Sequence, residues 1–187
     1  MANINGTPFN DNNTVNNGAF RPSLNGTNSS DIINGLAGDD LINGGGGDDI
    51  LNPGPGFDTL IGGSGFDQFR YDTGRAFTRS DIGADRIDDF AVNNINGSGA
   101  DLFILDKQTF TALDTVANSS MNLSDFAIVN SDNLVGTSNA AIVYNPGSGN
   151  LFYNQNESAP GVGTGGLIAV LTGSPDNLSS LDFFVQA

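Results

Sequence analysis

Residues 26–70 repeat one pattern of hydrophobic and polar residues every nine positions. The eighth position of all five blocks holds a large apolar residue: Ile33, Ile42, Leu51, Leu60 and Phe69. The first six positions are rich in Gly, Ser, Asn and Asp, which favour a tight turn, and the last three suit a short strand. Because side chains alternate along a strand, the eighth position faces inward, and the seventh and ninth face outward. The pattern predicts a parallel β-roll in which two blocks form one coil and equivalent turns stack eighteen residues apart.

The rest of the chain favours further short strands. Apolar runs occur at residues 102–105, 126–129, 141–144, 151–153 and 167–171. The segment AIVYNPGSGNLFYN predicts a hairpin around a Pro-Gly-Ser-Gly loop, and residues 122–126 and 177–184 each favour one helical turn. No segment shows sustained helical periodicity. We therefore expect an all-β chain with an N-terminal edge or capping segment (1–25), a β-roll (26–70) and a β-rich C-terminal cap (71–187).

The N-terminal segment is expected to pack against the roll. Block 17–25 keeps the nine-residue frame, with Leu24 in the eighth position but Pro22 in the sixth, as an atypical edge repeat would. In the roll, outward-facing seventh positions hold Ile32, Leu41 and Ile50, and an exposed aliphatic strip usually marks a contact. We expect the N-terminal segment to cover this strip with Ile4, Phe9 and Val15, and a dimer or an extracellular ligand is the alternative.

The sixth position of every block is an aspartate: Asp31, Asp40, Asp49, Asp58 and Asp67. Stacking should place Asp31, Asp49 and Asp67 along one edge of the roll, with Asp40 and Asp58 along the other. Seven acidic residues and no basic residue lie between residues 31 and 67. Carboxylates on strands ~4.8 Å apart repel each other by roughly 1–4 kcal/mol per pair, so a cation is needed between the turns. Hard oxygen ligands on flexible turns favour Ca²⁺ over Mg²⁺.

A flexible linker and an EF-hand both fit the acidic repeat less well than a roll. A flexible acidic linker does not account for five apolar residues in frame, and an EF-hand would need a glutamate in its twelfth position. Asp39 and Asp48, in the fifth position of their blocks, are expected to be solvated turn acids, with direct metal ligation as the alternative.

Composition narrows the possible chemistry. The 187 residues include 21 acidic and six basic side chains, giving a formal net charge of −15, and there is no Cys and no His. This excludes thiolate and imidazole metal sites and a Ser-His-Asp triad. A nucleic-acid partner is not expected, because phosphate binding needs concentrated positive charge. No apolar run approaches ~18 residues, so no membrane span is expected, and the first residues do not resemble a Sec-type signal peptide.

The repeat resembles the RTX family (repeats in toxin), whose pattern is G-G-x-G-x-D-x-U-x with U a large apolar residue. GGGGDDILN (44–52) fits at every defined position, and GGSGFDQF (62–69) fits with Phe69 as the apolar residue. The blocks at 26 and 53 depart from the pattern, because Thr27, Ser29 and Pro53 replace glycines. The resemblance implies a Ca²⁺ ion between turns eighteen residues apart, held by backbone carbonyls and by the aspartates of both turns.

Carried over to this chain, the resemblance implies three sites within the roll. One would comprise Thr27, Ser29, Asp31, Gly44, Gly46 and Asp49, a second Leu36, Gly38, Asp40, Pro53, Pro55 and Asp58, and a third Gly45, Gly47, Asp49, Gly62, Ser64 and Asp67. The residues Gly54, Gly56, Asp58, Gly63, Gly65 and Asp67 would face the C-terminal side and start further sites.

Residues 71–187 resemble the cap of serralysin-type secreted proteins. ADRIDDF (84–90) is similar to that family's A-D-x-I-x-D-F, which implies that Asp85 and Asp89 complete one or two further calcium sites shared with the cap. A solvated turn acid is the alternative for Asp85. The segment LDFFVQA (181–187) resembles the uncleaved signal read by type I secretion systems, and a packed edge strand is the alternative.

The resemblance implies a secreted, extracellular protein whose partners are Ca²⁺ and the type I secretion machinery. Serralysins also carry a zinc protease domain with an HExxH motif, which this sequence lacks, so proteolysis does not transfer and no enzymatic activity is expected. Because cytosolic calcium is low, the chain would fold outside the cell, where binding energy becomes folding energy.

Other functions stay open. Arg70, Arg75, Arg79 and Arg86 would form a basic strip of a carbohydrate-binding module for an acidic extracellular polysaccharide, or would only neutralise nearby acids. A structural role in a surface layer or matrix is a further alternative. A glycoside hydrolase that uses paired carboxylates is less favoured, because nearly all clustered acids belong to the repeat.

Overall fold

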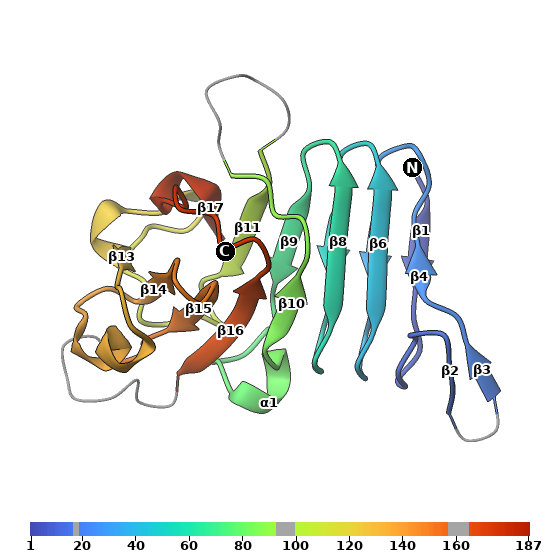
Figure 1. The fold of residues 1–187 in the computed structure, drawn as a ribbon, viewed down its shortest axis with the longest axis horizontal. Coiled ribbons are helices and arrows are strands. Elements are labelled where there is room, and N and C mark those ends of the chain that lie inside the picture. The colour runs from blue at the N-terminus through green and yellow to red at the C-terminus, as the bar shows by residue number, and fades with distance from the viewer. Residues whose placement is uncertain (17–18, 93–99, 157–164) are drawn as a thin grey trace.

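A computed structural model describes residues 1–16, 19–92, 100–156 and 165–187, with only the backbone of 14–16. Two large sheets lie face to face, as in the predicted parallel β-roll, and few residues are helical (Figure 1). The first sheet has the order β1 (Asn3–Asn5), β5 (Ile32–Asn34), β7 (Ile50–Asn52), β9 (Gln68–Tyr71), β11 (Leu102–Asp106), β17 (Phe183–Gln186) and β12 (Ser119–Ser120). The second has the order β13 (Phe126–Ile128), β14 (Ile142–Asn145), β15 (Asn150–Tyr153), β16 (Gly166–Leu171), β10 (Asp85–Ile87), β8 (Thr59–Ser64), β6 (Leu41–Gly46) and β4 (Leu24–Asn25).

The remaining elements are short. The antiparallel pair β2 (Thr14–Asn16) and β3 (Ala19–Arg21) lies apart from both sheets. Helix α1 (Arg79–Ile82) precedes β10. Single 3₁₀ segments occupy Leu123–Asp125, Asp132–Thr137 and Ser180–Asp182, so the first and last confirm the two predicted helical turns. The predicted hairpin is confirmed as the antiparallel pair of β14 and β15.

The strands of the roll pair in parallel and in the predicted register. Ile33 lies opposite Leu51, and Ile42 lies opposite Leu60, each partner eighteen residues further along the chain. The eighth position is fully buried in all five blocks, which confirms the inward direction inferred from the pattern. Burial of a large apolar side chain contributes about 1.5–3 kcal/mol, so this ladder between the sheets contributes substantially to the roll's stability.

The N-terminal segment adds a coil to the roll instead of covering its outer face. Strand β1 pairs in parallel with β5, with Ile4 opposite Ile33, and Ile4 packs against the core. The expected cover is therefore wrong for Ile4, because its side chain continues the inner ladder. Phe9 lies under the Arg21 guanidinium, 4.8 Å from the ring centroid. The side chain of Val15 is outside the described residues.

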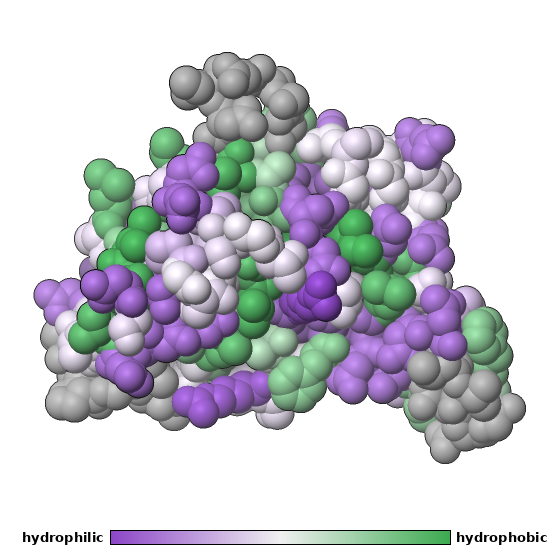
Figure 2. Space-filling view, in the orientation of Figure 1, coloured by the Kyte–Doolittle hydropathy of each residue, from purple (hydrophilic) through white to green (hydrophobic). Residues whose placement is uncertain are grey.

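The outward strip itself is present and half-buried. Ile32 and Ile50 lie side by side on neighbouring coils, as expected. On the other sheet, Figure 2 shows a small hydrophobic patch over β6 and β8 among hydrophilic residues, where Leu41 and Ile61 are half-buried.

The two sheets continue past residue 70 into the C-terminal region. Ile87 of β10 lies opposite Leu60, and Phe103 of β11 lies opposite Phe69. The ring of Phe183 stacks on that of Phe103 with centroids 5.0 Å apart. Strand β17 lies between β11 and β12, so the LDFFVQA segment forms an inner strand of the sheet and not an edge strand.

Candidate metal centre

The sixth-position aspartates form two columns joined by backbone hydrogen bonds. The N–H of Asp31 donates to Oδ1 of Asp49 at 2.7 Å, and the N–H of Asp49 donates to Oδ1 of Asp67 at 2.9 Å. In the second column, the N–H of Asp40 donates to Oδ1 of Asp58 at 2.7 Å. All five carboxylates are buried. The predicted division of the acids between the two edges of the roll is therefore correct.

The second carboxylate oxygen of most of these aspartates has no partner. Oδ2 is buried and accepts no hydrogen bond in Asp40, Asp49, Asp58, Asp67 and Asp85. A buried carboxylate oxygen without a donor is costly, by several kcal/mol when it is charged. Such an oxygen is well suited to bind a cation.

In two turns, the unpartnered oxygen shares a small space with a backbone carbonyl of the next turn. A Cβ placed on Gly44 would lie 2.4 Å from Oδ2 of Asp49 and 2.5 Å from the carbonyl oxygen of Gly62. A Cβ on Gly35 would lie 2.7 Å from Oδ2 of Asp40 and 2.3 Å from the carbonyl oxygen of Pro53. Carboxylate and carbonyl oxygens therefore face one another where the glycine leaves room, and this combination of ligands suits Ca²⁺.

Other predicted carbonyl ligands also face the following turn. Carbonyl oxygens of one turn lie within 2.3 Å of a Cβ built on a glycine of the next in five pairs: Thr27 with Gly45, Leu36 with Gly54, Gly38 with Gly56, Gly45 with Gly63, and Gly47 with Gly65. The turns stack this closely because the second of each pair is a glycine with positive φ. Leu36 has φ +79°, which is unusual for leucine and matches the glycines in its position.

Several other predicted ligands take part in hydrogen bonds between turns or within one turn. The carbonyl of Pro55 accepts from the N–H of Gly38 at 3.0 Å, and that of Ser64 accepts from Gly47 at 2.8 Å. Gly46 donates to the Thr27 carbonyl at 2.9 Å, and the Thr27 hydroxyl lies 3.3 Å from the Ser29 carbonyl. One such hydrogen bond links the two turns of each predicted ligand set. Within the described part of the chain, no three acidic side chains form a cage, so an ion here depends on backbone carbonyls.

The pKa values of the aspartates follow their surroundings. Burial raises the pKa of Asp40 and of Asp67 to about 6, with a further increase from neighbouring acids. Burial also raises the pKa of Asp49, Asp58 and Asp85. The pKa of Asp31 is lowered instead, by hydrogen bonds from the N–H of Ala2 and from the Thr27 hydroxyl. At neutral pH a bound cation would relieve the unfavourable burial of the five charges whose pKa is raised.

Asp85 and Asp89, the two acids expected to complete sites shared with the cap, have different positions. Asp85 is fully buried and extends the second column, because its Oδ1 accepts from the N–H of Asp58 at 3.0 Å. It is therefore not a solvated turn acid. Asp89 accepts from the N–H groups of Gly62 and Gly63 through its two oxygens, both at 2.8 Å, and so closes the last turn of the repeat.

Sequence reasoning missed two members of the columns. Oδ1 of Asp101 accepts from the N–H of Asp67 at 3.1 Å, and burial raises the pKa of Asp101 to about 7. The block NGSGADLFI (96–104) carries the nonapeptide pattern with Asp101 in the sixth position, although 34 residues separate it from Asp67. Asp11 donates from its N–H to Oδ1 of Asp40 at 2.7 Å, and GTPFND (6–11) is the turn that holds it.

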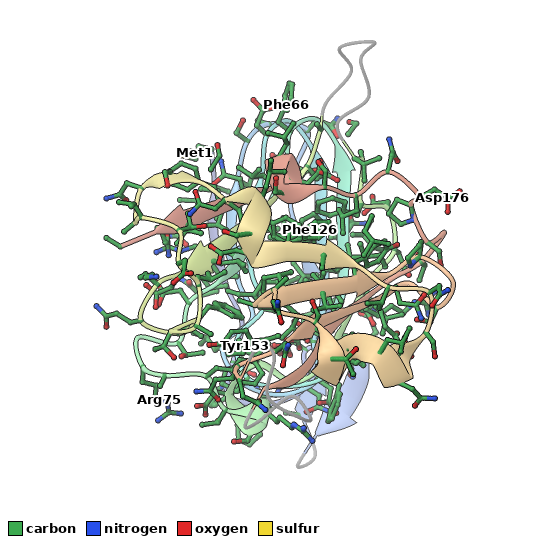
Figure 3. All side chains as sticks on the ribbon, turned by 90° about the vertical axis from the view of Figure 1, so that its left-hand side faces the viewer. Met1, Phe66, Arg75, Phe126, Tyr153 and Asp176 are labelled. Carbon is green, nitrogen blue, oxygen red and sulfur yellow. The ribbon has the colours of Figure 1, made fainter. Side chains whose placement is uncertain are left out.

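The fifth-position acids bind backbone as well as facing solvent. Oδ1 of Asp48 accepts from the N–H of Phe66, and Oδ1 of Asp39 accepts from the N–H of Phe57, both at 3.0 Å. Both residues are exposed, as expected for solvated turn acids, and each also bonds the backbone of the next coil. Phe57 and Phe66 occupy the fifth position of the last two blocks and are 68% and 53% exposed. Figure 3 shows Phe66 projecting from the turn edge of the roll, at the opposite edge from Arg75.

Most of the predicted basic strip is neutralised by nearby acids. Arg70 pairs with Asp72, Arg75 with Asp81, and Arg86 with Asp88. Arg79 makes no ion pair within the described part of the chain, and its Nε donates to the carbonyl of Gly165 at 2.8 Å.

The repeat itself matches a known family model. The model for the RTX calcium-binding nonapeptide repeat matches residues 25–60 and 53–70. Residues 25–70 are RTX calcium-binding repeats. The match ends where the nine-residue period ends and does not extend into the C-terminal region. A comparison with curated proteins found no match to the chain. Among the described residues, no helix has the length and hydrophobicity needed to cross a membrane.

Proposed function

We propose that this protein is a secreted, non-enzymatic calcium-binding protein whose RTX roll folds when Ca²⁺ binds between its turns. The observation that carries the proposal is the set of five buried Oδ2 atoms without a hydrogen-bond donor. Ca²⁺ would be held by these oxygens and by the carbonyls that face them, and it would supply the positive charge that residues 31–67 lack. No catalytic role is assigned, because the clustered acids of the roll already bind the backbone of the neighbouring coil.

Coupling of folding to calcium follows from the same geometry. Without a cation, each coil must bury a carboxylate beside another, so the calcium-free roll is disfavoured at neutral pH. A ligand that binds only the folded state stabilises it increasingly as its concentration exceeds Kd. Cytosolic calcium is low and extracellular calcium is high, so folding would follow export.

The position of LDFFVQA supports this order of events. Phe183 and Val185 are fully buried, and β17 pairs on both sides. If this segment is the type I secretion signal, the secretion machinery must bind it before the cap folds. Low calcium during export would keep the segment accessible.

A calcium titration tests the proposed function. We expect circular dichroism to show little β-structure in chelator and a cooperative gain at millimolar Ca²⁺, with a much smaller effect of equal Mg²⁺. Identical spectra in chelator and in calcium would refute coupled folding. For secretion, deletion of residues 181–187 should abolish export from cells that carry a type I system, and export at the full-length rate would refute the signal.

One observation favours a second candidate function, which is carbohydrate binding. Arg79, which makes no ion pair among the described residues, lines a pocket of about 680 Å³ together with the exposed ring of Phe57 and with Phe152. Aromatic faces stack on sugar rings, and a guanidinium binds a sugar carboxylate. Arg79→Ala should weaken retention on immobilised alginate, whereas Arg70→Ala should not. If the unmodified protein shows no retention on alginate in calcium, this candidate is wrong for that glycan.

A further inference from the structure

In two turns at the N-terminal end of the roll, the aspartate accepts hydrogen bonds from a residue of its own turn. They share the sequence Gly-Thr-x-x-x-Asp, in residues 6–11 and 26–31. Oδ2 of Asp31 accepts from the N–H of Thr27 at 2.8 Å and from its hydroxyl at 2.7 Å. Oδ2 of Asp11 accepts from the N–H of Thr7 at 2.6 Å and from its hydroxyl at 3.0 Å. The threonine in the second position thus gives two donors to the aspartate in the sixth.

The turns without this threonine are built differently. Their second positions are Leu36, Gly45, Gly54 and Gly63, and all four have φ between +79° and +98°. Threonine is β-branched and avoids positive φ, and neither Thr7 nor Thr27 adopts it. In each of these four turns, Oδ2 of the sixth-position aspartate has no donor. The residue in the second position therefore decides whether Oδ2 of the aspartate has a donor within its own turn.

We propose that Thr7 and Thr27 replace calcium in the two N-terminal turns, so that ion binding starts at the turns that lack threonine in the second position. The Oδ2 of Asp31 already has two donors, and its Oδ1 accepts from the N–H of Ala2. An ion would have to displace these donors and would gain little in return. The first of the three predicted sites, between turns 26–31 and 44–49, then holds no ion.

The two ends of the roll would therefore differ in their dependence on calcium. The N-terminal end is closed by hydrogen bonds within the chain, and the following coils depend on calcium. The inference rests on the proposed calcium binding, and it identifies a threonine as the residue that decides which turns bind an ion.

The test counts bound Ca²⁺ by native mass spectrometry at saturating calcium. Asp31 belongs only to the first predicted site, so Asp31→Asn should leave the ion count unchanged, whereas Asp40→Asn should lower it by at least one. Thr27→Gly restores the family's residue and permits positive φ, so it should raise the count by one. Thr27→Ser keeps both donors and should retain the count of the unmodified protein.

The outcomes separate this inference from the proposed function. If the unmodified protein binds no calcium, the proposed function fails. If it binds calcium and Asp31→Asn removes an ion, the threonine inference is overturned and calcium binding stands. If Asp31→Asn does not fold, the Thr27→Gly variant decides, because an unchanged count in that variant also overturns the inference.

Discussion

The backbone N–H of Asp31 donates to Oδ1 of Asp49 across one full coil of the roll, at 2.7 Å. The adjacent acid, Asp48, turns the other way and accepts from the N–H of Phe66 in the following coil at 3.0 Å. Of these two adjacent acids, Asp49 therefore accepts from the preceding coil and Asp48 from the following coil. Asp49 keeps one carboxylate oxygen without a hydrogen-bond donor, and Asp48 lies at the solvent-exposed edge.

This difference predicts unequal effects of two similar substitutions. Asp67→Asn removes a buried charge from the column of Asp31 and Asp49, and we expect it to lower the calcium count by at least one ion. Asp48→Asn keeps an acceptor for the N–H of Phe66, so it should keep the count and cost less than about 1 kcal/mol of stability. Native mass spectrometry and urea denaturation in calcium measure both effects. Equal losses of calcium from the two variants would contradict the assignment of ligands.

Space beside the first-position glycine should control calcium affinity. Gly44 has no positive φ, so Gly44→Ala introduces no backbone strain and acts only through its Cβ, 2.4 Å from Oδ2 of Asp49. We expect the calcium midpoint to rise at least about tenfold, equivalent to an overpacking cost of about 1–3 kcal/mol. Gly46→Ala, in the same turn, meets only the movable Ser64 hydroxyl at 3.1 Å and should change the midpoint little. Similar midpoints for the two variants in isothermal titration calorimetry would contradict this geometry.

The pH dependence should reverse when calcium is added. Burial raises the pKa of Asp40 and Asp67 from 3.8 to about 6. Between these values the calcium-free folded state binds more protons than the unfolded chain, so its free energy of unfolding falls as pH rises. Calcium needs ionised carboxylates, so its affinity rises over the same window.

In chelator, we therefore expect any residual structure to be more stable near pH 5 than near pH 7. The calcium midpoint should instead be about tenfold lower near pH 7, because roughly one proton per site is displaced at the lower pH. Denaturation in chelator and calcium titration at both pH values measure the two trends. A chelated protein that gains stability towards pH 7 would contradict the raised pKa values.

The inner strand β17 should contribute strongly to the stability of the cap. Phe183 is fully buried and stacks on Phe103, so Phe183→Ala should cost about 3–5 kcal/mol. Leu181, two residues earlier, is 65% exposed, and Leu181→Ala should change stability by less than about 0.5 kcal/mol. Thermal unfolding in saturating calcium compares the two. A small loss for Phe183→Ala would show that β17 packs only weakly.

Much of the roll could be predicted because its signal is local. The nine-residue period fixes which residue faces inward, so Ile33 and Leu51 could be placed opposite each other from their spacing alone. Asp101 could not be placed in the same way, because 34 residues, and not eighteen, separate it from Asp67. The coil at the N-terminus was missed for a similar reason, since the hairpin of β2 and β3 interrupts the repeat between Ile4 and Ile33.

The sequence by itself determined the repeat unit and the two columns of aspartates, because both follow from the nine-residue period. Only the tertiary structure decided which carboxylate oxygens lack a partner. That outcome depends on the backbone angle in the second position of a turn and on the N–H of a residue one coil away. It also decided that LDFFVQA lies inside a sheet, because the partners of β17 come from parts of the chain far away in sequence.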